Sequence, residues 1–325
     1  MKYGMIQELL SISGLFWSLV LIYVALTKSP TVMRPCVIMI VIKCITDLAA
    51  SMVNYFLSER LITTGNVLYI IAEGPCRFTS YETCFSSHML LFSLLQQNLV
   101  WLMCSYLFRF YILNYHDPAL KIFLLTAIVV YIPSLALSVY WMRVCYEWIQ
   151  FNERHAPKMF AKPEDLAMAG AVIHQSGLVT CVILLVLSTL GLLVYFCISY
   201  MMWKFLKERT SRLSKIALVL NTQLVKVIHF QALIPFLTIS GISTLILMHY
   251  YVVDPIRIQA LPSVFFSTTL SIFPLSYIFF MPPYFNFCLG NPKKEVTRRI
   301  KARLKMGSTV ELAHSTAGVY PLTTF

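Results

Sequence analysis

Charged side chains are scarce in this chain of 325 residues. Asp, Glu, Lys and Arg make up 12% of it, whereas hydrophobic residues make up 58%, and the mean hydropathy is +0.72. Soluble proteins carry about twice that share of charged residues, roughly 25%. The sequence also lacks a low-complexity linker that would separate domains. We therefore expect one membrane domain over residues 1–290, followed by a short basic tail over residues 291–325.

Motifs that carry catalysis or bind cofactors are missing as well. No Ser-His-Asp, Walker or Gly-x-Gly-x-x-Gly arrangement is present, and the histidines lack the His-x-x-x-His spacing of metal ligands. The seventh apolar stretch contains no lysine, so a retinal Schiff base has no attachment point there. These absences argue against an enzyme and predict no metal and no cofactor.

Seven long apolar stretches fill most of the chain. A helix needs about 20 mostly apolar residues to cross a hydrocarbon core of roughly 30 Å, and the lack of period-2 alternation argues against a barrel. We predict an all-α membrane protein, a seven-transmembrane helix bundle with its termini on opposite sides. The predicted spans are residues 5–27, 35–57, 84–114, 120–142, 173–203, 227–252 and 260–288.

Basic residues are distributed unevenly between the two sides of this bundle. With the N-terminus outside, 17 Lys and Arg fall on inner segments and 8 on outer ones, while nine of the 14 acidic residues fall outside. Because Lys and Arg near span ends are retained in the cytosol, the N-terminus is predicted to lie outside. The formal net charge of +12 then belongs to an inner face beside anionic lipids and does not indicate a nucleic-acid surface.

The tail after the seventh span carries two further signals. Asn291-Pro292 is a plausible helix start, and Val296, Ile300 and Leu304 recur every four residues among basic side chains. This pattern predicts a short amphipathic helix on the anionic inner leaflet. The final Thr323-Thr324-Phe325 resembles a PDZ-binding carboxyl terminus, a weak three-residue match.

Three of the nine cysteines lie on the predicted outer side. Cys76 and Cys84 flank the entry to span three, and Cys145 follows span four. A disulfide there would tie the second outer loop to the top of span three. We prefer Cys84–Cys145, with Cys76–Cys145 as the competing pair, because sequence alone does not fix connectivity.

Two ionisable residues lie within the second predicted span. Lys43 and Asp47 are four positions apart, one helical turn, so their charges can neutralise each other on one face. The pair either fixes helix packing or acts as an intramembrane switch, in which Asp47 binds a cation or changes protonation as helices move. No other span offers a clear second carboxylate, which weakens the case for a transporter.

The third predicted span carries three consecutive amide side chains, Gln96, Gln97 and Asn98. Three successive residues fan through about 200° around a helix, so all three can be satisfied only if protein surrounds the span. We therefore predict that the third helix is central. The amides either form hydrogen bonds between helices or contact a ligand.

Arg109 lies at the inner end of the third span, within the aromatic residues of 106–111. It could snorkel to the lipid headgroups. Alternatively, it latches the helices in an off state and, once released, meets a cytosolic partner. The partner-facing surface would then include the basic residues of the next inner loop, Lys207, Arg209, Arg212 and Lys215.

Prolines interrupt three of the predicted spans. A proline removes one backbone hydrogen bond and kinks a helix, which provides a hinge between two bundle arrangements. The prolines expected to kink spans four, six and seven are Pro133, Pro235, Pro274, Pro282 and Pro283.

Several short motifs lie in or near the ends of the predicted spans. They are Arg60-Leu61-Ile62, the run from Glu73 to Phe78, the run from Tyr106 to Leu113, and Tyr131-Ile132-Pro133-Ser134. Gln231-Ala232-Leu233-Ile234-Pro235 and the run from Pro274 to Tyr284 are two more. With these motifs the chain resembles the nematode serpentine chemoreceptors of class delta, in the Str superfamily of seven-transmembrane G-protein-coupled receptors. The resemblance extends over nearly all of residues 5–284.

This resemblance implies detection of a small molecule at the plasma membrane of sensory cilia and coupling to a heterotrimeric G protein. It places Arg109 and the neighbouring basic residues on the G-protein face by analogy of position. The chain departs from the rhodopsin pattern, because Phe108-Arg109-Phe110 replaces Asp-Arg-Tyr and Met281-Pro282-Pro283-Tyr284 replaces Asn-Pro-x-x-Tyr. Phe285 also stands where these nematode receptors usually have arginine.

The ligand pocket is expected in the outer half of the bundle, with apolar walls and a few polar anchors. The candidate lining residues are His88, Phe92, Gln96, His174, Gln175, Met248, His249, Phe265 and Phe266. Two other functions stay open: a ligand-gated cation channel of the seven-helix odorant-receptor type, with its N-terminus inside, and a membrane protein that no longer signals.

Overall fold

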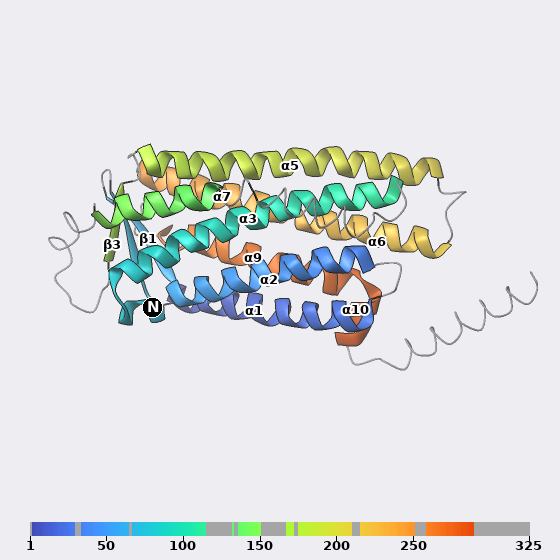
Figure 1. Ribbon diagram of the computed structural model, residues 1–325, viewed down its shortest axis with the longest axis horizontal. Helices are drawn as coiled ribbons and strands as arrows, with labels where there is room; N and C mark the ends of the chain where they lie inside the picture. Colours follow the sequence, from blue (N-terminus) through green and yellow to red (C-terminus); the bar gives the residue numbers. More distant parts are fainter. Residues whose placement is uncertain are drawn as a thin grey trace, which may run out of the picture.

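Long helices dominate the structure, a computed structural model. It describes residues 2–29, 34–64, 67–114, 132, 136–150, 167–171, 175–209, 215–250 and 258–288. The predicted amphipathic helix and the PDZ-like terminus lie outside these residues. The first helix starts at the same end of the bundle as a small β-sheet, and α6 starts at the other end (Figure 1). Following the predicted orientation, we name these the outer end and the inner end.

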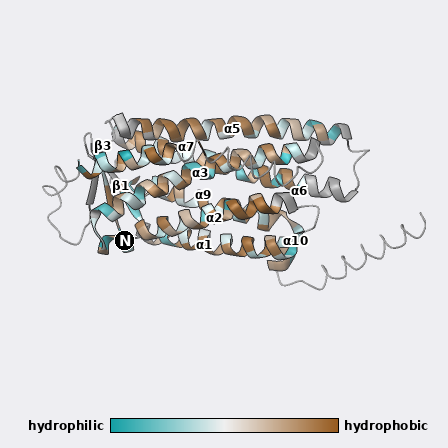
Figure 2. Ribbon diagram, viewed as in Figure 1, coloured by the Kyte–Doolittle hydropathy of each residue, from teal (hydrophilic) through white to brown (hydrophobic). Residues whose placement is uncertain are grey.

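The described helices run nearly parallel to one long axis (Figure 1), with apolar residues along most of α1, α2 and α5 (Figure 2). Six candidate spans in the described part of the chain are long and apolar enough to cross a membrane. Residues 136–150, from the fourth predicted span and beyond, are also helical. The helices are α1 (Lys2–Lys28), α2 (Arg34–Leu57), α3 (Tyr81–Asn114), α5 (Gln175–Arg209), α6 (Lys215–Gln231), α7 (Leu233–His249), α9 (Leu261–Phe280) and α10 (Pro282–Cys288).

The first three predicted spans agree with α1, α2 and α3 to within a few residues. The later boundaries differ, because helices extend past the apolar stretch where they leave the membrane. Helix α5 continues to Arg209, and α6 begins at Lys215, well before the predicted start of span six at residue 227. The fourth helix continues to Gln150, past its predicted end at Met142.

Two helix interruptions coincide with predicted proline hinges. A turn at Ala232 separates α6 from α7, three residues before Pro235, and extended Met281 separates α9 from α10, which begins at Pro282. A proline disfavours helical backbone just before it and cannot donate to the preceding turn. Pro274, by contrast, lies inside α9 without ending it. Pro133 lies outside the described residues.

A three-stranded antiparallel sheet at the outer end was not predicted. Strands β1 (Glu59–Thr64) and β2 (Val67–Ala72) pair in register from Glu59 opposite Ala72, and β3 (Ala167–Ala171) pairs with β2. The sequence did carry a signal for the hairpin. Gly65-Asn66 separates two runs rich in β-branched residues by two positions, which is typical of a tight β-turn.

The predicted Cys84–Cys145 disulfide is wrong. The structure pairs Cys76 with Cys84, whose Cα atoms are 5.7 Å apart, and leaves Cys145 free and buried. The 3-10 turn Pro75–Phe78 folds the chain back on the start of α3, so the nearer cysteine reaches Cys84. The Cys145 sulfur instead lies 3.9 Å from the Ser86 hydroxyl. The alternative pair, Cys76–Cys145, is excluded by the same bond.

The interior divides into an outer and an inner hydrophobic core. The outer core gathers around Phe85, Phe92, Trp141, Trp148 and Phe266, and the inner core gathers around Tyr106, Phe273, Tyr277 and Tyr284. Of the candidate spans in the described part of the chain, those of α9 and α3 are the most buried, with 67% and 61% of their residues inside the bundle. The predicted central position of the third helix is therefore confirmed, and α9 shares it.

Candidate functional site

Arg109 is turned into the bundle at the inner end of α3. Its side chain is 3% exposed. One guanidinium nitrogen donates to the Gln231 side-chain oxygen at 3.4 Å, and the other donates to the Tyr277 hydroxyl. The guanidinium carbon also lies 5.1 Å from the centre of the Tyr277 ring. Arg109 thus joins α3 to both α6 and α9.

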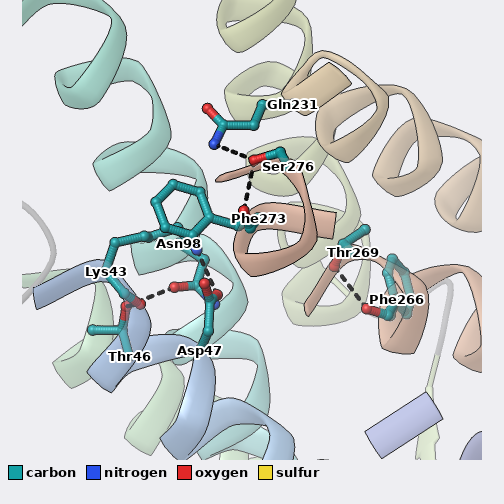
Figure 3. A network of polar contacts seen from close by, with 9 residues as sticks. All are labelled: Lys43, Thr46, Asp47, Asn98, Gln231, Phe266, Thr269, Phe273 and Ser276. Atoms are coloured by element: carbon teal, nitrogen blue, oxygen red, sulfur yellow. Dashed lines mark hydrogen bonds and ion pairs between the residues drawn. The ribbon is translucent and has the colours of Figure 1, made fainter. Parts of the chain in front are cut away.

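Gln231 carries this connection further. It is the last residue of α6, and its amide nitrogen donates to the Ser276 hydroxyl at 2.8 Å. That hydroxyl in turn donates to the Phe273 carbonyl at 2.6 Å (Figure 3). Gln231 adjoins the turn at Ala232, and Ser276 follows Pro274 within the continuous helix α9.

Lys43 and Asp47 form a buried ion pair on α2, with side chains 3% and 1% exposed. The Lys43 ammonium also lies 4.6 Å from the centre of the Phe273 ring, so it contacts α9 (Figure 3). The second carboxylate oxygen of Asp47 has no hydrogen-bond partner among the described residues. The predicted pairing across one helical turn is therefore present. Whether it is a switch is a separate question.

The three amides of the third span are all buried, and two of them bond to other helices. The Gln96 oxygen accepts from the Trp141 indole nitrogen at 2.8 Å, and the Asn98 oxygen accepts from the Thr46 hydroxyl at 2.8 Å (Figure 3). Gln97 makes no side-chain hydrogen bond within the described part of the chain. Two of the three amide side chains therefore form hydrogen bonds between helices.

Apart from the Gln96–Trp141 bond, whose tryptophan belongs to the outer core, these contacts form one polar network through the inner half of the bundle. It runs from Lys43 past Phe273 to Ser276, Gln231 and Arg109, and so joins α2, α9, α6 and α3. Its chemistry is that of hydrogen bonds and ion pairs that can exchange partners. No group of His, Cys, Asp and Glu that could hold a metal occurs among the residues described.

A second polar site lies at the outer end of α3. His88 pairs through Nδ1 with a carboxylate oxygen of Glu59, the first residue of β1, and both side chains are buried. The His88 ring contacts Phe92 edge to face at 4.7 Å and stacks with Trp148 at 6.3 Å. Three of the predicted pocket residues, His88, Phe92 and Gln96, therefore lie along one face of α3.

Sequence reasoning missed Glu59, Trp141 and Trp148 at this site. Glu59 directly follows an apolar span and precedes the hairpin, and without the hairpin its direction could not be predicted. The two tryptophans fall near or beyond the predicted end of span four at residue 142. Their seven-residue spacing, two helical turns, would have placed them on one face had the helix been extended.

The structure describes the side chains of three of the six remaining predicted pocket residues. Phe266 is buried in the same outer core as Phe92, Phe265 is half-buried, and Met248 is buried. His174 lies outside the described residues. Gln175 and His249 are helical, but their side chains are outside the description.

Of the residues predicted to face the G protein, the structure describes the side chains of two, Lys207 and Arg109. Lys207 is exposed near the end of α5, with its ammonium 5.2 Å from the centre of the Trp203 ring. Arg109, in contrast, is buried. Arg209 ends α5 and Lys215 begins α6, without described side chains, and Arg212 falls between the described segments.

Comparisons with known proteins agree with this architecture. The family model described as "Serpentine type 7TM GPCR chemoreceptor Srd" matches residues 3–290. Serpentine receptor class delta-28 of Caenorhabditis elegans is 33% identical over 301 residues, 90% of this chain and 91% of the relative. Class delta-26 and class delta-30 of the same organism are 31% and 33% identical, over 92% and 90% of this chain and 93% and 90% of the relatives, respectively.

Proposed function

The chain belongs to the Srd family of serpentine seven-transmembrane chemoreceptors, and from this premise we propose that it detects a small molecule and activates a heterotrimeric G protein. The family is one of receptors and not of enzymes. Neither the channel nor the non-signalling alternative is favoured by this relationship. The proposed location is the plasma membrane of sensory cilia.

The observation that carries the proposal is the attachment of Arg109 to two helices, one of which is interrupted directly beside the contact. Arg109 bonds to Gln231 at the turn between α6 and α7, and to Tyr277 just after Pro274. A buried arginine held by two partners acts as a latch more readily than as an anchor in the headgroups. Snorkelling is therefore the weaker explanation for this residue.

In the proposed mechanism the structure represents the latched, inactive state. Binding of a ligand in the outer half shifts α3 relative to its neighbours, which weakens the contacts of Arg109. The inner segment α6 then swings about the turn at Ala232, and Arg109 becomes available to the G protein. A hinge next to the bond that restrains it needs only a small displacement to open.

Lys43 and Asp47 set the resting position of α9 in this mechanism. The ammonium of Lys43 lies against Phe273, whose carbonyl accepts from Ser276, the partner of Gln231. A shift of α9 would change the surroundings of the ion pair and of the Arg109 latch together. This links the proposed intramembrane switch to the G-protein face.

The experiment that tests the function is a ligand screen in heterologous cells. Responses that require both this receptor and a Gα subunit support the proposal. Responses that persist when G proteins are removed, and that carry a cation current, would favour the channel. A tag on Met1 separates the same alternatives: it should bind antibody on intact cells, whereas a channel of the odorant-receptor type would expose it only after permeabilisation.

A further inference from the structure

Glu59 is held at the outer end of the bundle with little freedom. It follows Ser58, whose φ of 37° is unusual for a residue other than glycine and turns the chain from α2 into β1. With its amide turned toward Glu59, Gln7 donates to the Glu59 carbonyl at 2.9 Å and accepts from its N–H at 3.2 Å. The backbone is therefore fixed from both sides, and the side chain points to α3.

The carboxyl group of Glu59 is buried, and its charged form requires a cation. Glu59 is 4% exposed and His88 is 1% exposed. A buried carboxylate is strongly disfavoured unless a positive group pairs with it. The nearby Arg60 is not that group, because its guanidinium lies 3.4 Å from Glu73 at the surface. Within the described residues, only His88 pairs with Glu59.

Aromatic rings surround this pair on the α3 side. The His88 ring contacts Phe92 and Trp148, Phe85 meets Trp148 edge to face at 6.3 Å, and Phe92 stacks with Trp141 at 5.6 Å. The faces of aromatic rings attract organic cations, most strongly where water is excluded. The combination of a buried carboxylate and several ring faces is suited to a positively charged ligand.

Two buried nitrogen atoms on the same face of α3 are left without partners. His88 Nε2 and Gln96 Nε2 make no hydrogen bond within the described part of the chain, although both residues are at most 1% exposed. Residues 88, 92 and 96 follow one another at intervals of one turn, so the backbone positions of His88 and Gln96 lie about 12 Å apart along the helix axis. Gln96 cannot easily turn its nitrogen away, since its oxygen accepts from Trp141.

We propose that the ligand of this receptor is a small protonated amine that binds His88, with Glu59 as its counter-ion; this proposal rests on the receptor function proposed above. His88 donates through Nδ1–H to Glu59, so the lone pair of Nε2 accepts an N–H of the ligand. The ammonium supplies the positive charge that the Glu59 carboxylate requires. At its other end, an oxygen of the ligand accepts from Gln96.

Other ligand classes fit this site less well. A carboxylic acid would bring a second negative charge next to Glu59, in a site that excludes water. An alcohol carries no charge and would bring no positive group to Glu59. A plain hydrocarbon would leave both buried nitrogen atoms unsatisfied, which is costly.

The test measures binding without a G protein, so that it can fail independently of the signalling proposal. Purified full-length receptor is heated with hexylamine, phenethylamine or aminohexanol at about 1 mM, and with hexanol, phenethyl alcohol and hexanoic acid as matched neutral and acidic probes. The amines should raise Tm, aminohexanol the most. The alcohols and the acid should leave Tm nearly unchanged.

The variant Glu59→Gln removes the charge but keeps an oxygen that accepts from His88 Nδ1–H. We expect its apparent Kd for amines to rise about tenfold or more, while Glu82→Gln, an exposed carboxylate on the first turn of α3, binds amines as the wild type does. The proposal is overturned if Glu59→Gln binds amines as tightly as the wild type does. It is also overturned if the alcohols or the acid raise the Tm of the wild type as much as the amines do, or if no amine raises it. Should Glu59→Gln fail to fold, the wild-type preference for amines over alcohols decides the question alone. Binding of amines without G-protein activation would overturn only the signalling proposal.

Discussion

Arg109 and Tyr277 are 168 positions apart in the sequence, yet a guanidinium nitrogen of Arg109 donates to the Tyr277 hydroxyl and its carbon lies 5.1 Å from the ring centre. The two residues therefore interact in two ways, through a charge-assisted hydrogen bond and through the ring face. Either interaction holds α3 to α9 at the inner end. The pair keeps Arg109 inside the bundle and so opposes its proposed release.

Tyr277→Phe should separate these two interactions. The ring face remains and the hydroxyl is lost, so the latch is weakened without an obvious change in packing. We expect basal G-protein activation to rise severalfold at equal surface expression. GTPγS binding by membranes, normalised to surface receptor, measures this. Unchanged basal activity would mean that the hydroxyl does not restrain the inactive state.

Arg109→Ala should abolish signalling while leaving expression and ligand binding nearly intact. Lysine keeps the charge but loses the planar fork that reaches Gln231 and Tyr277 together. Arg109→Lys should therefore retain partial coupling. If Arg109→Ala instead removes the receptor from the membrane, and the few inserted molecules still signal, the residue is a snorkelling anchor.

The Lys43–Asp47 pair should show strong coupling in a double-mutant cycle. Breaking a buried ion pair by removing one partner typically costs about 3–5 kcal/mol, whereas replacing both by apolar residues is often nearly neutral. We expect Lys43→Met and Asp47→Leu each to lower the Tm of the purified receptor markedly, and the double variant to recover most of the loss. Thr268→Val, which removes only a hydroxyl bonded within α9, serves as the control. Additive losses in the double variant would show that the two side chains act independently.

The Cys76–Cys84 disulfide predicts which cysteines matter at the outer end. Cys76→Ser and Cys84→Ser should each cost about 2–3 kcal/mol, the loop-closure value for a short loop, and the double variant should cost no more than either single change. Cys145→Ser should be milder, because Cys145 is free. The surface expression and the Tm of these four variants are the quantities to measure. A loss at Cys145 equal to that at Cys84, without further loss in their double variant, would restore the pairing that the sequence favoured.

Much of the bundle was predictable because the membrane imposes its own regularity. Long apolar stretches fix the helices, and the four-residue spacing of Lys43 and Asp47 was enough to predict their ion pair. The proline pattern also anticipated the interruptions near Pro235 and Pro282. These features depend on local spacing, which a sequence shows directly.

Features that depend on contacts between distant segments were not predictable in the same way. The partners of Arg109 come from α6 and α9, and no spacing rule relates them to α3. The partner of His88 was missed because Glu59 reaches it only through the unpredicted turn at Ser58 into β1. The predicted disulfide was wrong for a related reason: Gly74-Pro75 indicates a turn but does not show that this turn brings Cys76 to Cys84.

The most direct test of the account is the basal G-protein activation of Gln231→Leu. Leucine fills a similar volume but can neither accept from Arg109 nor donate to Ser276, so α6 is released at its hinge while the core stays packed. Thr238→Val is the matched control, because among the described residues that buried hydroxyl bonds only to the Ile234 carbonyl of its own helix. The account predicts that GTPγS binding without ligand rises severalfold in Gln231→Leu and not in Thr238→Val, at equal surface expression. Equal basal activity in the two variants and the wild type would contradict the claim that Arg109 holds the receptor inactive through α6.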